Sequence, residues 1–193
     1  SIDEAFVRLN QPPNTNIYSW ARELRAQAYR NLGLPIAIGI GKNKCQAKLA
    51  NHIAKTIPTH AGIFELPDAE NSDKWLESVS IEDIWGIGHK VARWCRMQNI
   101  HTARQLRDMP TEVLHAKCGI SIVKVQLELR GQLCFPLSLT PLAKKETCVS
   151  RSFSRPITLV EELREAISTY VVCGSEKLRR QQQYARSITV FVR

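Results

Sequence analysis

The first nine residues, Ser1-Ile2-Asp3-Glu4-Ala5-Phe6-Val7-Arg8-Leu9, place two adjacent carboxylates in a run of β-prone side chains. The pattern predicts a short strand, in which neighbouring residues point to opposite faces, so that Asp3 and Glu4 reach one site from two directions. Carboxylate oxygens are ligands that suit Mg²⁺, and a pair of such ions can hold phosphate oxygens during phosphoryl transfer. A solvated turn or a helix cap is the alternative interpretation, so the stretch alone does not establish a metal site.

The residues that follow alternate between helical and strand-like patterns. After turn residues at 10–14, apolar residues recur at helical spacing from Asn16 to Leu32, and Gly33 ends the run. Pro35–Ile40 has the composition of a buried strand. The opening strand, this helix and this strand would form a crossover unit, which predicts an α/β fold.

The segment Gly39–Asn51 reads as the end of a strand followed by a helix that Asn43 caps. Lys44 and Lys48 are four residues apart and so share one face near the helix N-terminus. Free N–H groups, the helix dipole and the lysines would attract phosphate there, although the segment is not a Walker A loop. A solvated basic face is the alternative. Further along, Ala61–Leu66 predicts a strand and Asp68–Ser78 a helix.

The stretch Ile81–Trp94 matches a helix-hairpin-helix pattern, with the sequence Gly86-Ile87-Gly88 at the turn and Ala92 at the close-packing position. Both glycines can adopt positive φ, and their N–H groups, with those that open the second helix, would form a nest for a DNA phosphate. Lys90 and Arg93 lie where they could reinforce this contact. An ordinary αα-turn is the alternative, but the complete pattern in a basic region favours phosphate binding.

The rest of the chain predicts three more helices, a tether and a β-α-β unit. The helices are Thr102–Met109, Pro110–Lys117 and Ser121–Leu129, and the tether, which lacks periodicity, is Gln132–Glu146. A strand at Thr147–Arg155 would place Arg151, Phe153 and Arg155 on one face. A helix at Leu159–Gln181 and a strand at Ala185–Arg193 would complete the unit.

The charge distribution points to a polyanion partner. The formal net charge is +9, of which +1 lies in the residues up to Ser80 and +8 in those from Ile81 onward. Nucleic acid is the usual partner of such a chain, and a membrane is disfavoured because the basic residues do not line one amphipathic helix. The six cysteines are scattered without metal-ligand spacing, and no run of 18 apolar residues occurs. We therefore expect a soluble cytoplasmic protein.

The order of these motifs, "SIDEAF", "GIGKNKCQAKLANHIAK", "IEDIWGIGHK" and "SRSF", resembles the Y-family (lesion-bypass) DNA polymerases. Within that family the sequences of these motifs are most similar to the UmuC-type catalytic subunit of the SOS mutagenesis polymerase. The resemblance covers the whole chain. It implies a partial palm at residues 1–79, a helix-hairpin-helix thumb at 80–131, a tether at 132–146 and a partial little finger at 147–193.

The resemblance also implies roles for individual residues. Asp3 and Glu4 would be catalytic carboxylates that hold two Mg²⁺ ions, and Lys48, with Lys44 beside it, would contact the triphosphate of a dNTP. Contacts to primer–template DNA would come from the thumb and the little finger, through Gly86, Ile87, Gly88, Lys90, Arg93, Arg151 and Arg155. An accessory UmuD-type subunit, a recombinase filament and a sliding clamp are further implied partners.

One departure from the family leads us to expect a fragment. Full-length members begin with a strand that carries another metal-binding aspartate, followed by an aromatic residue and a fingers domain, and none of these is in the sequence. We therefore expect an incomplete two-metal site and no polymerisation by the chain alone. A non-enzymatic DNA-binding module is the alternative. A helix-hairpin-helix nuclease or glycosylase is a third reading, which the sequence favours least; a glycosylase would use Lys90 or Asp108 after the hairpin.

Overall fold

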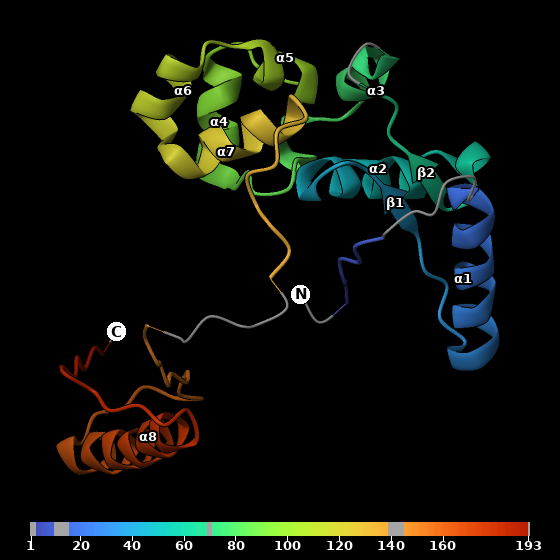
Figure 1. The fold of residues 1–193 in the computed structure, drawn as a ribbon. Helices are drawn as coiled ribbons and strands as arrows, with labels where there is room; N and C mark the ends of the chain where they lie inside the picture. The colour runs from blue at the N-terminus through green and yellow to red at the C-terminus, as the bar shows by residue number, and fades with distance from the viewer. Residues whose placement is uncertain (1–2, 10–15, 69–70, 139–144, 193) are drawn as a thin grey trace. The chain divides into compact units, whose positions relative to one another are not determined.

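The computed structural model describes residues 3–9, 16–68, 71–138 and 145–192. The chain forms two compact units, Ser1–Leu137 and Ser138–Arg193. Figure 1 shows the first unit in blue to orange and the helix of the second unit in red. No helix in the described ranges has the length and apolar character needed to span a membrane.

The sheet of the described residues consists of two short parallel strands, β1 (Ile38–Ile40) and β2 (Ile63–Glu65). The helix α2 (Lys44–Thr56) connects them, so the crossover unit is β1-α2-β2. The predicted α/β character is therefore confirmed in a helix-rich form. The strand predicted at Ser1–Leu9 is wrong for Asp3–Leu9, because β1 and β2 pair with each other and neither pairs with this segment.

The helix predicted between Asn16 and Gly33 is confirmed as α1 (Ile17–Leu32). The side chain of Asn16 accepts hydrogen bonds from the N–H groups of Tyr18 and Ser19, which are among the donors that a helix N-terminus leaves free. Gly33 ends the helix with φ of 67°. Arg25 ties α1 to the loops beside the sheet by donating to the carbonyl groups of Ile36 and Ala61.

Close contact between α2 and β1 depends on a glycine. A Cβ atom at Gly39 would collide with the backbone of Ala47 and Asn51 in α2, so only glycine lets the helix lie directly on the strand. The side chain of Asn51 donates to the carbonyl of Ala37, 2.8 Å away, and holds the helix in register. Figure 1 shows α2 lying along the strands.

A bundle of short helices follows the sheet. The Asp68–Ser78 helix is confirmed only for α3 (Asp73–Ser78), and the first helix of the predicted hairpin is a 3-10 turn at Ile81–Asp83. The predicted helices after it are confirmed with small shifts in their bounds: α4 (His89–Met97), α5 (Ala103–Asp108), α6 (Thr111–Cys118) and α7 (Ile120–Leu129). Thr102 and Gln105 form a capping box at the start of α5.

One hydrophobic core runs through α2 and the bundle. It includes Leu49 and Ile53 of α2, Leu76 of α3, Leu106 of α5 and Leu114 of α6, each almost inaccessible to solvent. The palm–thumb boundary predicted at residues 79 and 80 lies inside this continuous core. The two predicted regions therefore share buried apolar surface, which favours a fixed arrangement between them.

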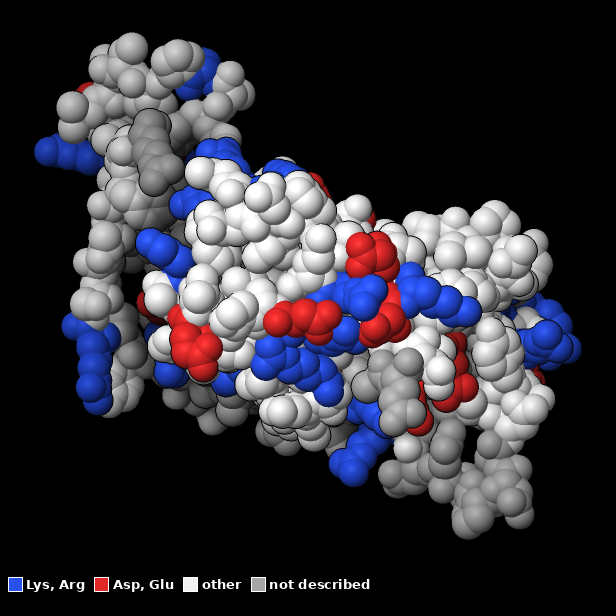
Figure 2. All heavy atoms as spheres, turned by 90° about the horizontal axis from the view of Figure 1, so that it is seen from above, with Lys and Arg blue, Asp and Glu red and all other residues white. Residues whose placement is uncertain are grey.

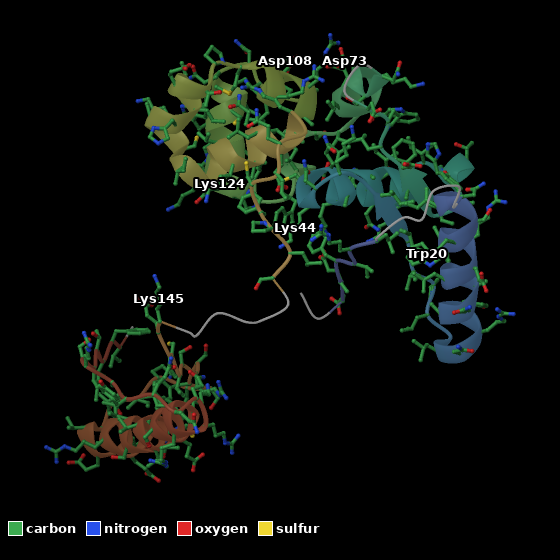
Figure 3. The ribbon with its side chains drawn as sticks, viewed as in Figure 1. Trp20, Lys44, Asp73, Asp108, Lys124 and Lys145 are labelled. Atoms are coloured by element: carbon green, nitrogen blue, oxygen red, sulfur yellow. The ribbon has the colours of Figure 1, made fainter. Side chains whose placement is uncertain are left out.

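An ion-pair network joins α3 to α5 on the surface. Asp73 of α3 pairs with Arg104 and Arg107 of α5, and Arg107 also donates to Asp108. The guanidinium of Arg107 lowers the pKa of Asp73. Figure 3 labels Asp73 and Asp108 at the top of the bundle, and Figure 2 looks onto the molecule from that side, where red and blue side chains lie side by side. This face carries no single sign of charge.

The second unit contains one described element, the helix α8 (Val160–Arg180), which confirms the helix predicted at Leu159–Gln181. The strands predicted at Thr147–Arg155 and Ala185–Arg193 are wrong for the described residues, which carry no strand in the range 145–192. The β-α-β unit is therefore not formed there. An extended segment becomes a strand only by backbone pairing, and these two segments pair with no strand in the described part. Arg193 and residues 139–144 of the predicted tether lie outside the described residues.

Candidate nucleic-acid interface

The carboxylate of Glu4 and the ammonium of Lys48 form an ion pair on the first unit. Their side chains are 43% and 24% exposed, respectively. The hydrogen bond from Lys48 lowers the pKa of Glu4, so Glu4 stays ionised at neutral pH. The structure thus brings together Lys48 and one of the two predicted catalytic carboxylates, although they lie 44 residues apart in the sequence.

A metal site is not complete among the described residues. Asp3 and Glu4 offer hard oxygen ligands, but no group of three His, Cys, Asp or Glu side chains that could hold an ion occurs in the ranges that the structure describes. Glu4 is also held by Lys48, so a cation would compete with an ammonium for this carboxylate. These residues alone do not fit a two-metal centre.

The N-terminus of α2 is already occupied by groups of this chain. Asn43 caps the helix as predicted, and its side chain accepts the N–H of Gln46 at 3.0 Å. The N–H of Cys45 donates to the carboxylate of Glu128 in α7 at 2.8 Å. The prediction of free N–H groups for a phosphate is therefore wrong for Cys45 and Gln46. The anion at this helix end is a glutamate from the bundle.

Lys44 lies beside the start of the predicted tether (Gln132–Glu146), hereafter called the linker, as Figure 3 shows. Its ammonium donates to the carbonyl of Pro136 at 3.0 Å and lies 5.5 Å from the centre of the Phe6 ring. Phe6 packs edge-on against Trp85, which packs edge-on against Phe135, with centroid distances of 5.9 and 5.5 Å. Lys44 is thus engaged by the chain itself, whereas sequence reasoning assigned it to a nucleotide.

The two hairpin glycines differ in conformation. Gly86 has φ of 91°, and a Cβ atom there would lie 2.9 Å from a methyl group of Val125, so both the turn and the packing require glycine. Gly88 has φ of −93° and ψ of 170°, an extended conformation open to any residue. The prediction of positive φ at Gly88 is wrong, because this residue serves as the N-cap of α4. A Cβ atom at Gly88 would meet nothing within 4 Å.

The N-terminus of α4 presents an uncapped, positively charged helix end. Gly88 offers no side-chain cap, and no acidic residue lies in the first turn. Gly88 and Lys90 are exposed, as is Arg93 one turn further on, whereas Ile87 is buried beneath the turn. Neither Lys90 nor Arg93 belongs to an ion pair of the described residues; Glu82 pairs with Arg96 instead. First-turn N–H groups, the dipole and two cations can bind a phosphate there.

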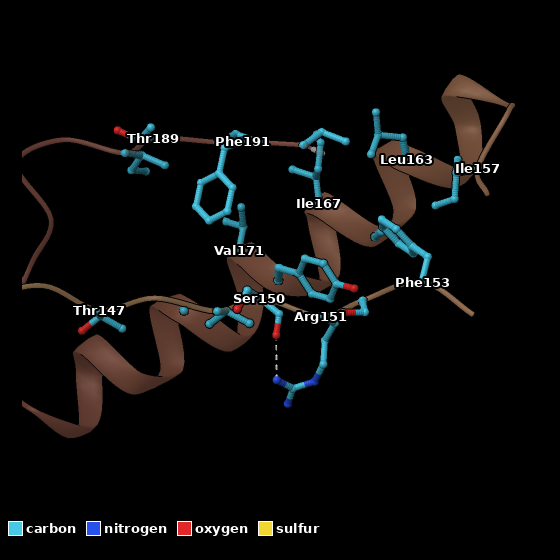
Figure 4. Close-up of a pocket in the computed structure, with 18 of the residues that line it drawn as sticks. Thr147, Ser150, Arg151, Phe153, Ile157, Leu163, Ile167, Val171, Thr189 and Phe191 are labelled. Carbon is cyan, nitrogen blue, oxygen red and sulfur yellow. Dashed lines mark hydrogen bonds between the residues drawn. The ribbon is translucent and has the colours of Figure 1, made fainter. Parts of the chain in front are cut away.

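In the second unit, the two predicted DNA-binding arginines contact their own neighbours. Arg151 donates to the carbonyl of Ser150 at 2.9 Å, and Arg155 donates to Glu162 of α8 at 2.7 Å. Figure 4 shows Arg151 and Phe153 at the edge of a groove of about 890 Å³, which α8 and the two flanking extended segments line. Arg151 is exposed and remains available to a ligand.

Sequence reasoning missed two buried polar residues of α7, Gln126 and Glu128, both fully inaccessible to solvent. The amide of Gln126 donates to the carbonyl groups of Leu106 and Met109 and so holds the connection between α5 and α6. The sequence does contain a signal for these two residues. Both residues stand between apolar residues in the run Val125–Leu129, where a helix face that points inward allows a polar group only if it has partners.

Comparison with known proteins places both ends of the chain in one family. The impB/mucB/samB family matches residues 1–52, and the C-terminal domain of the same family matches residues 144–193. Protein MucB of Escherichia coli is 32% identical over 194 residues, and Protein UmuC of Salmonella typhimurium is 34% identical over 195 residues. Each alignment covers 100% of this chain and 46% of the relative, so the chain spans about half the length of these curated relatives.

A more distant relative is DNA polymerase IV of Desulfatibacillum aliphaticivorans, 24% identical over 197 residues that make up 100% of this chain and 48% of that protein. Among solved structures, DinB from Sulfolobus solfataricus aligns with a TM-score of 0.46 and 23% identity, over 58% of this chain and 32% of that one. The two family matches and the alignments over the whole of this chain confirm the resemblance found in the motifs: this chain belongs to the impB/mucB/samB family.

Proposed function

We propose that this chain is part of an error-prone translesion DNA polymerase, and that its first unit binds the backbone of primer–template DNA. One observation carries the proposal: the uncapped N-terminus of α4 lies at an exposed Gly88, with the exposed cations Lys90 and Arg93 close by. The two relatives quoted first are MucB and UmuC, and the more distant one is a DNA polymerase by name. DNA polymerase activity would belong to the whole protein of which this chain would be a part.

The hairpin suits a sequence-independent contact. A Cβ atom at Gly88 would have open space around it, so a phosphate oxygen can approach the N–H groups at the start of α4. Helix N-termini and backbone N–H groups bind phosphates without reading bases. A polymerase must grip every sequence that it copies, and a contact of this kind meets that need.

Lys48 would take part in nucleotide binding. In nucleotidyl transfer, the 3′-hydroxyl of the primer loses its proton and attacks the α-phosphate of a dNTP, and the bond to the β-phosphate breaks so that pyrophosphate leaves. Positive charge near the triphosphate stabilises the transition state. Lys48 would supply such charge after exchanging Glu4 for a phosphate oxygen. Asp3 and Glu4 would hold Mg²⁺ only together with ligands that the described residues do not provide, so the proposal contains no step through a metal.

A non-enzymatic DNA-binding module is the second candidate for the chain alone. The Glu4–Lys48 ion pair favours it, because Glu4, one of the two predicted catalytic carboxylates, and Lys48, the predicted triphosphate contact, neutralise each other. A glycosylase is disfavoured, because both carboxylate oxygens of Asp108 are already engaged by Arg107. An accessory UmuD-type subunit, a recombinase filament and a sliding clamp stay predictions from the family resemblance.

Variants at the hairpin test the DNA contact. Gly88→Val fills the open space above the turn without a conformational conflict, and we expect it to weaken binding of a labelled primer–template duplex, measured by fluorescence anisotropy. Lys90→Ala should weaken binding as well and reduce the slope of log K against log salt by about 0.9. Lys74→Ala on α3 is the control, because it removes the same charge from an exposed site away from the hairpin.

If the hairpin binds the phosphate, the loss of DNA affinity depends on where a lysine is removed and not only on the change in net charge. If Lys74→Ala weakens binding as much as Lys90→Ala, the interaction is a diffuse attraction to a basic protein and the hairpin assignment is wrong. If Gly88→Val binds like the unmodified chain, the phosphate does not lie at the start of α4. Circular dichroism and thermal unfolding of each variant establish that the fold is intact.

A further inference from the structure

A glutamate in the bundle holds three separated parts of the first unit together. Glu128 of α7 is fully buried, and its carboxylate lies between the N-terminus of α2 and the first residues of the linker. Oε2 accepts the N–H of Cys45 at 2.8 Å. Oε1 accepts the N–H groups of Cys134 and Phe135 at 3.1 and 2.8 Å.

All three donors lack another obvious acceptor. Cys45 is the second residue of α2, where a helix leaves its N–H groups without intrahelical partners. Cys134 and Phe135 belong to a segment with no strand or helix. A carboxylate can only accept hydrogen bonds, and the positive end of the α2 dipole favours its negative charge. The three donors therefore match a side chain that offers two acceptor oxygens.

Other contacts support the same junction. The side-chain amide of Asn43, the cap of α2, donates to the main-chain carbonyl of Glu128 at 2.8 Å. Lys44 donates to the carbonyl of Pro136, and Trp85 of the hairpin packs on Phe135. The start of α2, the hairpin, the end of α7 and the start of the linker thus converge on one buried charge.

We propose that Glu128 is a positioning residue, whose carboxylate fixes the hairpin-bearing bundle and the first linker residues on the N-terminal end of α2. The distance between Lys48, one turn into α2, and the DNA-binding end of α4 then stays constant. This function rests on the proposed DNA binding, since a fixed distance matters only if both groups contact one substrate. The linker also leaves the first unit at a defined place, held by Cys134 and Phe135.

The first test uses the unmodified chain and measures the hydrogen-exchange rates of single N–H groups by NMR. We expect the N–H groups of Cys134 and Phe135 to exchange slowly, with protection close to that of Cys45, although they lie outside regular structure. Exchange at the rate of an unstructured segment would overturn the proposal without any variant. This measurement needs no DNA.

Three variants then separate charge from shape. Glu128→Gln keeps the size of the side chain but turns an NH₂ group toward N–H donors, so it should expose the N–H groups of Cys45, Cys134 and Phe135 to faster exchange. Glu128→Asp keeps the carboxylate on a shorter arm and should retain more protection than Glu128→Gln. Gln126→Leu is the matched control. It removes buried hydrogen bonds from the same helix, away from α2, and should leave these three groups protected relative to the rest of the unit.

DNA binding gives the functional result. Glu128→Gln should weaken binding of a primer–template duplex by at least about tenfold, and Gln126→Leu, at temperatures where both variants are folded, should weaken it less. If Glu128→Gln protects the three groups better than Glu128→Asp, the residue only fills space and the proposal is wrong. If the exchange results hold but no variant changes DNA affinity, the junction exists and its role in positioning is refuted. If the unmodified chain does not bind DNA at all, the proposed function fails instead.

Discussion

The two units of this chain contain amphipathic helices of similar kind, yet among the described residues only the first unit has a buried core. In the first unit, α2 buries six of its residues, among them Leu49 and Ile53, against the sheet and the bundle. In the second unit, α8 is longer and buries none, and no residue in the range 145–192 is buried. The comparison teaches that a helical pattern predicts a helix, whereas a stable domain requires a second layer to cover its apolar face.

The ends of α8 show how a helix can form with little burial. Glu161 and Glu162 lie in its first turn, and Lys177, Arg179 and Arg180 lie in its last turn. These charges complement the helix dipole, each contributing about 0.3–1 kcal/mol at low salt. Apolar residues such as Val171 and Val172 remain about half exposed. We therefore expect the first unit to unfold cooperatively and the second to lose its structure gradually.

Thiol labelling should show the largest difference between the units. Cys45 and Cys95 of the first unit are buried, and burial raises the pKa of Cys95 to about 11, whereas Cys148 and Cys173 of the second unit are exposed. Because the thiolate is the reactive form, the buried pair should react at least about a thousandfold more slowly than the exposed pair. Mass spectrometry of peptides after timed alkylation measures each rate. Equal rates at all four sites would mean that the first unit has no stable core.

Glycine substitutions should have opposite effects in the two units. Gly39→Ala forces a Cβ atom into the backbone of α2 and should destabilise the first unit by about 3 kcal/mol. Gly174→Ala lies inside α8, where a Cβ atom would make an ordinary contact 3.8 Å from Val149, so it should stabilise the helix by about 0.5–1 kcal/mol. Urea unfolding followed by circular dichroism measures both. A mild effect of Gly39→Ala would show that α2 does not lie directly on the strand.

A smaller effect should appear in the acid stability of the first unit. Arg107 lowers the pKa of Asp73, so this carboxylate binds a proton more weakly in the folded chain than in the unfolded one. Its contribution to stability is present above the unfolded pKa and is lost as the pH falls through the folded pKa, below about pH 4. NMR titration should find the midpoint of Asp73 closer to its ordinary value in Arg107→Met. Arg104→Met should move it less, because Arg104 makes the weaker interaction. Equal shifts in both variants would contradict this assignment.

Local signals in the sequence predicted the helices well. Asn16, Gly33 and Asn43 act within one turn of the residues that they cap, so their effect can be read from the chain directly. The same local signals predicted strands at Ser1–Leu9, Thr147–Arg155 and Ala185–Arg193, and the described residues of these segments form none. A strand depends on a partner that is distant in sequence, and the described residues supply none for these segments.

The candidate site was predicted in part, for the same reason. Sequence reasoning found the hairpin, and the structure leaves Lys90 and Arg93 exposed at the start of α4. Lys44 binds the carbonyl of Pro136, which lies 92 residues away in the sequence. The N–H group of Cys45 binds Glu128, which lies 83 residues away. No local pattern reveals that the anion at the start of α2 belongs to the chain itself.

The most direct test of the account is the salt dependence of DNA binding by the intact chain. Two primer–template duplexes of unrelated sequence would be titrated at several salt concentrations, with fluorescence anisotropy as the readout. We expect equal affinity for both duplexes and a linear fall of log K with log salt, as for contacts to phosphates alone. The double variant Lys90→Ala/Arg93→Ala should reduce the slope by about 1.8. Binding that ignores salt, that prefers one sequence or that is absent from a folded sample would contradict a phosphate-binding hairpin.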